Sequence, residues 1–248
     1  MKALQDPLFR VAVIAATPNP QQACWAGMHQ DYSESFVADE RDSWPDEERA
    51  GEVCVKRLLA GERGHYGPLE HAQIVLNVGF FPHSVMQQAR THRVGVSFDV
   101  QSMRYTGARI CRAAELNTLE ALEEVFYLRP LGTYRDRQGH SYTYTQAQRD
   151  HDLGLCSVAA AVYRDRVEKD GWAEEHARGL LPFDYRQHFV VSFSLRALMH
   201  FLDLRSKADA QPEIRALCDL IWPKFQTWTP EIAAWYEANR LGKARLAP

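Results

Sequence analysis

A stretch in the first half of the chain is rich in arginine and histidine, the residue types that bind phosphates. It contains the segments GHYGPLEH at residues 64–71, QQARTHR at residues 87–93 and SFDVQSMRY at residues 97–105. Its strongest hydrogen-bond donors are Arg90, His92, Arg93 and Arg104. The planar guanidinium group of arginine binds two oxygens of a phosphate at once. The stretch therefore predicts a site for one or more phosphate groups.

The same residues admit a purely structural interpretation, which their spacing leaves open. Residues 91–93 at the end of a helix would complement the helix dipole, and Arg104 could stand on the exposed face of a strand. Residues 97–105 alternate like a strand, however, and this alternation places Ser102 and Arg104 on one face, from which both could enter one pocket.

A second constellation lies between residues 184 and 205, which we expect to form a helix. His188, Ser192, Arg196 and His200 recur every four residues and would make one polar stripe. A polar stripe is usually solvated, but this one lacks Glu and Lys and lies beside aromatic residues, so a wall of a ligand site is equally plausible. Arg205 ends the helix, either as a simple C-terminal charge or as a ligand contact.

Several common active-site motifs are absent from the sequence. There is no GxGxxG, Walker A or GxSxG segment, so a Rossmann, P-loop or serine-hydrolase site is not supported. His65, Glu70 and His71 match neither HExxH nor HxxEH, which favours structural or ligand-contact roles over a metal site. No cysteine lies in either constellation, so thiolate catalysis has no candidate.

Composition narrows the class of protein further. The 248 residues are 46% hydrophobic and 25% charged, which is typical of a globular protein. The formal net charge of -3 argues against nucleic acid as the main partner, although small anionic ligands need only a local cluster of arginines. No apolar run is long enough to span a membrane. The five cysteines are scattered without a CxxC pair, which fits a reducing compartment such as the cytoplasm.

The order of the predicted elements indicates an α/β protein of the α+β type. Residues 11–16, 72–81 and 97–105 read as strands, and residues 125–129 as a short further strand. Helices are predicted over residues 45–60, 82–93, 152–168, 172–179, 184–205 and 209–225, with a last helix starting at Pro230. This order predicts a mixed sheet in the middle of the chain, packed by helices, and a helical second half. No linker is visible, so we expect a single domain over residues 1–248.

Three segments, taken in order, resemble the flavin-dependent thymidylate synthases. THRVGVSFDVQSMRY resembles the family signature RHRxxSxNxxSxRY, and GHYGPLEHAQIVL resembles its GHxxPxEH segment. ARGLLP and SLRALMHFLDLRSKADAQPEI resemble its C-terminal part. Together the matches cover most of residues 10–220, and three segments in the family's order are more specific than any one of them.

The chain also departs from the family pattern. The departures are Thr91 for the first Arg, one extra residue between Arg93 and Ser97, Asp99 for Asn, Val100 for Glu or Gln, His200 for Asn, and Asp209 for His. Arg90 precedes Thr91 and is expected to compensate for it. Gln101 lies beside Val100, and a local bulge would swing its amide into the pocket.

The resemblance implies a ThyX-like fold, an FAD cofactor, and NADPH and 5,10-methylenetetrahydrofolate as co-substrates for methylation of dUMP to dTMP. It implies a homotetramer with active sites between subunits. It also implies that dUMP contacts Gln88, Gln101, Ser102, Arg104, Arg178 and Arg205. FAD would be lined by His65, Arg90, Thr91, His92, Arg93, Ser194, Arg196 and His200.

Two of these residues are candidates for catalysis. Arg205 near the uracil carbonyl would stabilise negative charge as the ring is activated. Ser102 has no neighbouring base in the sequence, which favours a binding and polarising role over a nucleophilic one.

Three other functions compete with this interpretation. The first is a different FAD enzyme on the same scaffold with another nucleotide substrate, which the departures at Thr91 and Val100 motivate. The second is an RNA-binding protein that stacks bases on Tyr105, Tyr142 and Tyr144. The third is a histidine-based metal hydrolase. We rank them below the synthase in that order.

Overall fold

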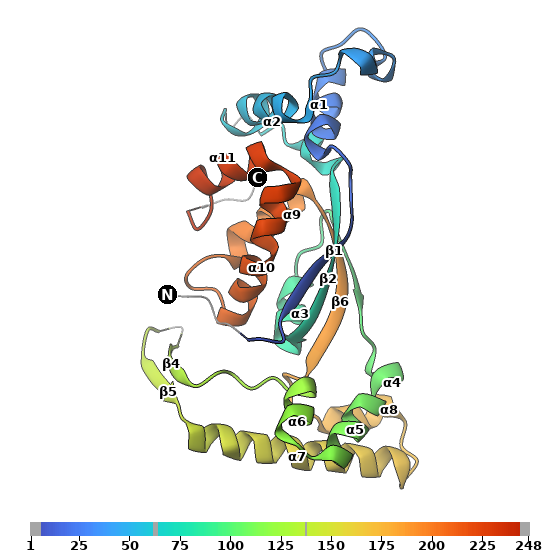
Figure 1. Cartoon of the computed structure of the whole chain (residues 1–248), viewed down its shortest axis with the longest axis vertical. Coiled ribbons are helices and arrows are strands. Elements are labelled where there is room, and N and C mark those ends of the chain that lie inside the picture. Colours follow the sequence, from blue (N-terminus) through green and yellow to red (C-terminus); the bar gives the residue numbers. More distant parts are fainter. Residues whose placement is uncertain (1–5, 62–63, 137, 244–248) are drawn as a thin grey trace.

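A twisted antiparallel sheet forms the middle of the molecule (Figure 1). The computed structural model describes residues 6–61, 64–136 and 138–243. The main sheet has the strand order β1-β2-β6-β3. Its strands are β1 (Arg10–Ala16), β2 (Gln73–Pro82), β3 (Val96–Val100) and β6 (Arg186–Ser194). Each neighbouring pair is antiparallel, so strands from the start, the middle and the second half of the chain share one sheet (Figure 1).

Helices cover one face of this sheet and extend from both of its ends (Figure 1). Against the face lie α3 (His83–Ala89), α9 (Leu195–Arg205) and α10 (Pro212–Trp228), with α11 (Pro230–Asn239) beside them. One end carries α1 (Pro20–Gln30) and α2 (Glu47–Cys54), which continues as a π-helical turn over Val55–Leu59. The other end carries α4 (Met103–Thr106), α5 (Ala108–Leu116), α6 (Leu119–Val125), α7 (Gln146–Glu168), α8 (Glu174–Ala177) and the hairpin of β4 (Gly132–Arg135) and β5 (Ser141–Tyr144).

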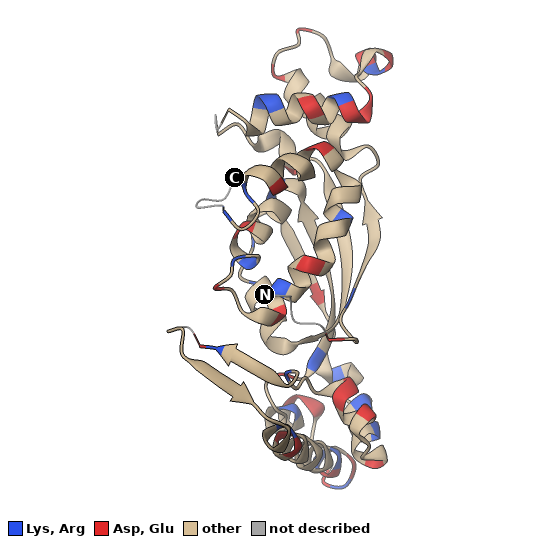
Figure 2. Cartoon of the chain, turned by 60° about the vertical axis from the view of Figure 1, so that its left-hand side comes forward, with Lys and Arg blue, Asp and Glu red and all other residues tan. Residues whose placement is uncertain are grey.

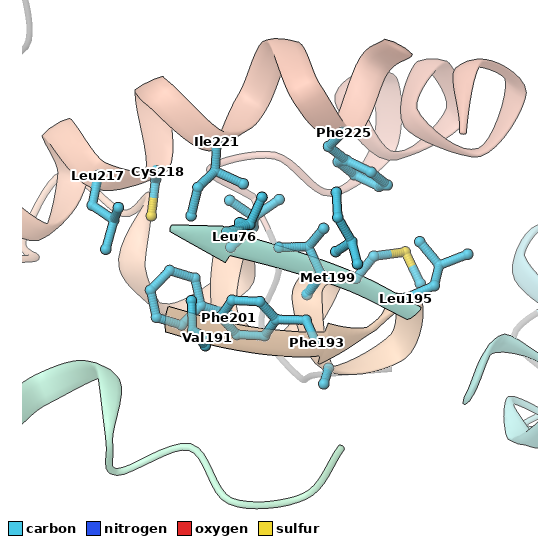
Figure 3. Packing of buried hydrophobic residues seen from close by; sticks show 14 of the residues in the cluster. Leu76, Val191, Phe193, Leu195, Met199, Phe201, Leu217, Cys218, Ile221 and Phe225 are labelled. Atoms are coloured by element: carbon cyan, nitrogen blue, oxygen red, sulfur yellow. The ribbon is translucent and has the colours of Figure 1, made fainter. Parts of the chain in front are cut away.

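The larger hydrophobic core lies between the sheet and the covering helices. Alternate residues of β2 and β6 point into it, because successive side chains of a strand face opposite ways. Leu76 and Val191 are almost fully buried there, against Met199 of α9 and Ile221 and Phe225 of α10 (Figure 3). The strands themselves carry few charged residues, whereas the helices at the far end carry both signs (Figure 2). Burial of these apolar side chains is the main force that fixes α9 on the sheet.

A buried arginine connects the sheet with the helical end of the molecule. Arg186, at the first position of β6, is 3% exposed and pairs with Asp6 at 2.7 Å. Its other nitrogens donate to the backbone oxygens of Glu123 and Phe80, at 2.7 and 2.8 Å. Beyond this link, a second hydrophobic cluster forms around Ile110 and Tyr163.

The predicted helix over residues 184–205 is wrong in its first half. Residues 186–194 form β6, a central strand between β2 and β3, and only Leu195–Arg205 is helical. The spacing of four that suggested a helix also places residues on one face of a strand, whose period is two. His188 and Ser192 therefore lie on the sheet, while Arg196 and His200 lie on α9, and the four do not form one helical stripe.

The predicted strand over residues 97–105 is also wrong in its second half. The strand ends at Val100, and Ser102 caps the short helix α4, with its Oγ accepting from the backbone N–H of Arg104 at 3.3 Å. Ser102 and Arg104 therefore do not share a strand face. Serine favours such cap positions because its hydroxyl satisfies a backbone donor at the helix start.

The α/β class with a sheet packed by helices is confirmed, as are the strands near residues 11–16 and 72–81. The pairing in the described sheets is antiparallel and not mixed, and the central strand β6 lies in the second half of the chain. Other boundaries shift. The predicted helix 82–93 ends at Ala89, α7 begins at Gln146 rather than at residue 152, and only Glu174–Ala177 of the predicted helix 172–179 is α-helical. In place of the strand at residues 125–129 there is a single bridge between Phe126 and Tyr185. Within residues 6–61, 64–136 and 138–243, no helix has the length and apolar character needed to cross a bilayer.

The packing of β2 leads to a stability prediction. Leu76 is fully buried, whereas Leu131 is 48% exposed, so the same truncation to alanine should have different costs. We expect Leu76→Ala to lower the free energy of unfolding by about 2–5 kcal/mol and Leu131→Ala by less than about 1 kcal/mol. Urea unfolding followed by circular dichroism measures both. Equal losses in the two variants would contradict the packing described here.

Candidate functional site

The arginine-rich segment forms a pocket beside the start of β3. This basic pocket has a volume of about 640 Å³ and is lined by Gln87, Arg90, Thr91, His92, Arg93, Val96, Ser97 and Phe98. Arg90 and Arg93 are exposed, whereas His92 is buried. Two exposed guanidinium groups around a concave surface suit an anionic ligand, because each can form bidentate, charge-assisted hydrogen bonds with its oxygens.

A glycine turn fixes the pocket against the start of α9. Gly95 has a positive φ of 68°, and its carbonyl accepts from the backbone N–H of Ser194 at 2.8 Å. A Cβ at this position would lie 2.5 Å from Ser194 Oγ, so no side chain fits without a shift.

Arg205 reaches the wall of the basic pocket from the last position of α9. Its Nε donates to His92 Nε2 at 3.1 Å. Its Nη2 donates to Thr91 Oγ1 at 2.9 Å and to the backbone oxygen of Gln88 at 3.2 Å. Residues from two separate segments, 87–93 and the end of α9, thus meet at one guanidinium group. Arg90, which is expected to compensate for Thr91, lines the same pocket.

His92 is a neutral imidazole at neutral pH. Burial, with Arg205 and His200 nearby, lowers its pKa to about 4. Since Nε2 accepts from Arg205, the ring proton belongs on Nδ1, an atom that is buried and has no partner. His200 packs edge-on against His92 at 5.1 Å between ring centroids, and its own Nδ1 is also buried without a partner. Burial lowers the pKa of His200 as well. Two unpaired ring nitrogens in this position suit contacts with a bound ligand.

A second group of predicted residues gathers at the other end of β3. Arg104 and Arg178 are exposed on neighbouring segments, and Arg104 pairs with Glu175 at 3.4 Å. Ser102 lies at the start of the same short helix as Arg104. No hydrogen bond or ion pair of the described residues joins this group to Gln88 or Arg205. Within one chain, the predicted nucleotide contacts therefore divide into two sets.

The prediction of a bulge at Gln101 is wrong. The pairing of β3 with β6 is regular from Val96 to Val100, and the Gln101 backbone N–H continues it by donating to His188 at 2.9 Å. Gln187 Nε2 donates to the Gln101 backbone oxygen at 3.3 Å. The side-chain Oε1 of Gln101 is nevertheless buried without a partner, so this amide can still accept a hydrogen bond.

The remaining predicted residues make contacts of their own. His65 pairs with Asp31 at 2.7 Å, and Arg196 pairs with Glu70 at 2.6 Å. Ser194 is buried and caps α9 through its Oγ. The side-chain amide of Gln88 donates to Gln211.

Known proteins match the chain over almost its whole length. The model of the family described as thymidylate synthase complementing protein matches residues 12–231. A flavin-dependent thymidylate synthase of Haloarcula marismortui is 32% identical over 96% of this chain and 99% of the relative. One of Halobacterium salinarum is 30% identical over 97% of this chain and 100% of the relative. The chain belongs to this family.

Solved structures share the fold of this family member. A UMP/dUMP methylase, PolB, of Streptomyces cacaoi, bound with 5-Br dUMP, has a TM-score of 0.72 at 21% identity and covers 97% of both chains. The flavin-dependent thymidylate synthase ThyX of Helicobacter pylori, complexed with FAD and dUMP, has a TM-score of 0.65 at 18% identity. The match covers 86% of this chain and 92% of the ThyX chain.

The sequence interpretation missed several side chains that support the site. The sequence does not indicate a partner for Glu70, which pairs with Arg196. Gln211 contacts Gln88 and Ser84, and Gln187 contacts His83 at 2.6 Å. Gln211 precedes the proline that starts α10, which is a helix-start signal, but nothing in the sequence indicates its partner. Among the residues that the structure describes, no cluster of His, Cys, Asp and Glu has the arrangement of a metal site.

His92 makes stability depend on pH. Its folded-state pKa of about 4 lies below the ordinary value of 6.5, so the unfolded chain takes up the proton first as the pH falls. Between pH 7 and pH 5 we expect the wild type to lose up to about 2 kcal/mol of stability relative to His92→Asn. Urea unfolding at both pH values measures this difference, and the other histidines act alike in the two proteins. An identical pH dependence would contradict a buried, neutral His92.

Proposed function

We propose that this chain is a flavin-dependent thymidylate synthase that methylates dUMP to dTMP. The carbon donor is 5,10-methylenetetrahydrofolate, and NADPH is the reductant. The observation that carries the proposal is the Arg205 guanidinium at the wall of the basic pocket, in a chain that aligns end to end with enzymes of this name. The pocket supplies a site for an anionic cofactor, and Arg205 supplies a positive charge at its edge.

The residues of the basic pocket fit FAD. Arg90 and Arg93 are exposed guanidinium groups that can bind the pyrophosphate. The unpaired ring nitrogens of His92 and His200 can hydrogen-bond to the ring system. When bound, the flavin supplies the hydride that completes the methyl group. The remaining predicted FAD contacts are His65, Thr91, Ser194 and Arg196. Each already has a partner within the chain, so we rank them after the other four.

We assign most contacts with dUMP by matching arginines to the negative charges of the nucleotide. Arg104 and Arg178 bind the phosphate of dUMP, with Ser102 as a further hydrogen-bonding group. Gln88 and Gln101 supply amide contacts. Arg205 faces the pyrimidine and stabilises the negative charge that develops as the ring is activated. Ser102 binds and polarises, because among the described residues no base contacts its hydroxyl.

We further propose a homotetramer in which each active site draws on more than one subunit. Its support is the separation of Ser102, Arg104 and Arg178 from Gln88 and Arg205 within one chain. The long helix α7 also exposes Leu155, Val158 and Val162, which lie at helical spacing on one face. An exposed apolar stripe of this kind is typical of a surface that another subunit covers.

Two further proposals concern the number of domains and the cellular compartment. We propose one domain over residues 1–248, since Arg186 ties the two hydrophobic clusters together. The five cysteines are buried and unpaired, which supports a reducing cytoplasmic compartment.

A different nucleotide substrate is the alternative with specific support. Thr91 and Val100 stand where the family pattern has charged or amide side chains. Thr91 lines the basic pocket, and Val100 directly precedes Gln101, a proposed nucleotide contact. The same cofactor would then serve a nucleotide other than dUMP. RNA binding and metal-dependent hydrolysis have no comparable support.

The decisive experiment is the visible absorption of the purified protein during anaerobic reduction by NADPH. We expect a yellow protein whose flavin bleaches much faster when dUMP is present, because cofactor and nucleotide share one site. Arg205→Ala should keep its flavin and lose the stimulation by dUMP.

The outcomes separate the candidates. Bleaching that does not respond to dUMP but responds to UMP or another nucleotide would favour the alternative substrate. A colourless protein that does not take up added FAD would contradict the proposal.

The role of Ser102 is tested by its removal. We expect Ser102→Ala to raise the KM for dUMP while keeping kcat within about 10-fold of the wild type, since a binding hydroxyl contributes modestly. Steady-state formation of dTMP gives both constants, with Ser141→Ala in the distant hairpin as a control. A loss of kcat by several orders of magnitude would instead indicate a nucleophile.

A further inference from the structure

We propose that Thr91 is a positioning residue whose hydroxyl orients the Arg205 guanidinium toward the nucleotide. The inference rests on the proposed function, because the nucleotide is the ligand assigned there. It concerns the position at which this chain lacks the arginine of the family pattern.

The hydrogen-bond polarity of the Thr91 hydroxyl is fixed by its surroundings. Its Oγ1 lies 2.7 Å from the backbone oxygen of Gln88 and 2.9 Å from Arg205 Nη2. A carbonyl oxygen only accepts, so the hydroxyl donates its single proton there. Its lone pair is then left to accept from Arg205. Valine has the same shape as threonine but can make neither hydrogen bond.

The contacts of Arg205 fix the plane of its guanidinium group. Nε is held by His92 and Nη2 by Thr91 and Gln88. Among the described residues, the second terminal nitrogen Nη1 makes no hydrogen bond or ion pair. Because the guanidinium is rigid and planar, fixing one edge also sets the direction of the other. Nη1 is therefore the donor that remains for a ligand.

The charge of Arg205 is held by neutral groups only. Its acceptors are an imidazole, a hydroxyl and a carbonyl, and no carboxylate of the described residues pairs with it. Its positive charge is consequently not offset and remains available for an anionic ligand or for developing negative charge. An arginine at position 91 would place a second cation beside this group. Threonine avoids that repulsion and adds an acceptor.

The first test compares two substitutions at one position. We expect Thr91→Val to lower kcat/KM for dUMP by roughly 10- to 100-fold, because a hydrogen bond to a charged group is lost. Thr91→Ser keeps the hydroxyl and should stay within about 2-fold of the wild type. Thr227→Val, which removes a hydroxyl bonded to the Pro223 carbonyl far from the pocket, is the matched control. Equal rates for Thr91→Val and Thr91→Ser would overturn the proposal.

The second test asks whether Thr91 acts through Arg205. In the Arg205→Ala background, Thr91→Val should cause no further loss of kcat/KM, since its partner is already gone. Independent, additive losses would mean that Thr91 acts elsewhere, for example on the cofactor, and would overturn the proposal. Flavin absorbance of each variant shows whether cofactor binding is unchanged.

A structural measurement separates this inference from the proposed function. Crystal structures of the wild type and of Thr91→Val should show the Arg205 guanidinium displaced from His92 only in the variant. This result does not depend on any turnover, so it stands even if the wild type proves inactive on dUMP. An unmoved Arg205 in Thr91→Val would overturn the positioning role.

Discussion

The junction between β6 and α9 is the constraint on which the candidate site depends. β6 lies in the centre of the sheet and continues directly into α9, so the direction of α9 is set by core packing. Ser194 caps α9, and its backbone N–H bonds to Gly95 just before β3. The junction therefore fixes the position of the basic pocket through Gly95 and the position of Arg205 through α9. Rigid elements hold functional groups more reliably than loops do.

Local charge, and not net charge, characterises this protein. The chain is slightly acidic overall, yet exposed arginines lie beside the start of β3, at Arg90 and Arg93, and beyond its end, at Arg104. His92 contributes as a neutral acceptor, since burial lowers its pKa to about 4. A neutral imidazole can hold Arg205 without offsetting its positive charge. A carboxylate in the same place would offset that charge. The arrangement suits small anionic ligands in an otherwise acidic molecule.

The sequence predicted the class of the fold and indicated which segments carry the candidate site residues, but not the geometry of those residues. Runs of hydrophobic residues predicted β1 and β2, and the family motifs indicated the arginines of the candidate site. The helix predicted over residues 184–205 failed because a spacing of four fits both a helix and a strand face. The shared face of Ser102 and Arg104 failed because the serine ends the strand and caps α4. The contacts of Thr91, His92 and Gln88 with Arg205 span more than a hundred residues, so local pattern carries no signal for them.

In the proposed homotetramer, Arg205 of one subunit and Arg104 of another serve the same active site, and mixing two inactive variants tests this arrangement. Arg205→Ala and Arg104→Ala chains would be co-refolded in equal amounts, and dUMP-dependent oxidation of NADPH measured. Random assortment leaves roughly a quarter of shared sites with both arginines intact, so we expect recovery to about that fraction of wild-type activity. Arg205→Ala mixed with the double variant should recover none. An equal mixture of the two single variants that stays inactive, although mixed oligomers have formed, would contradict the shared site.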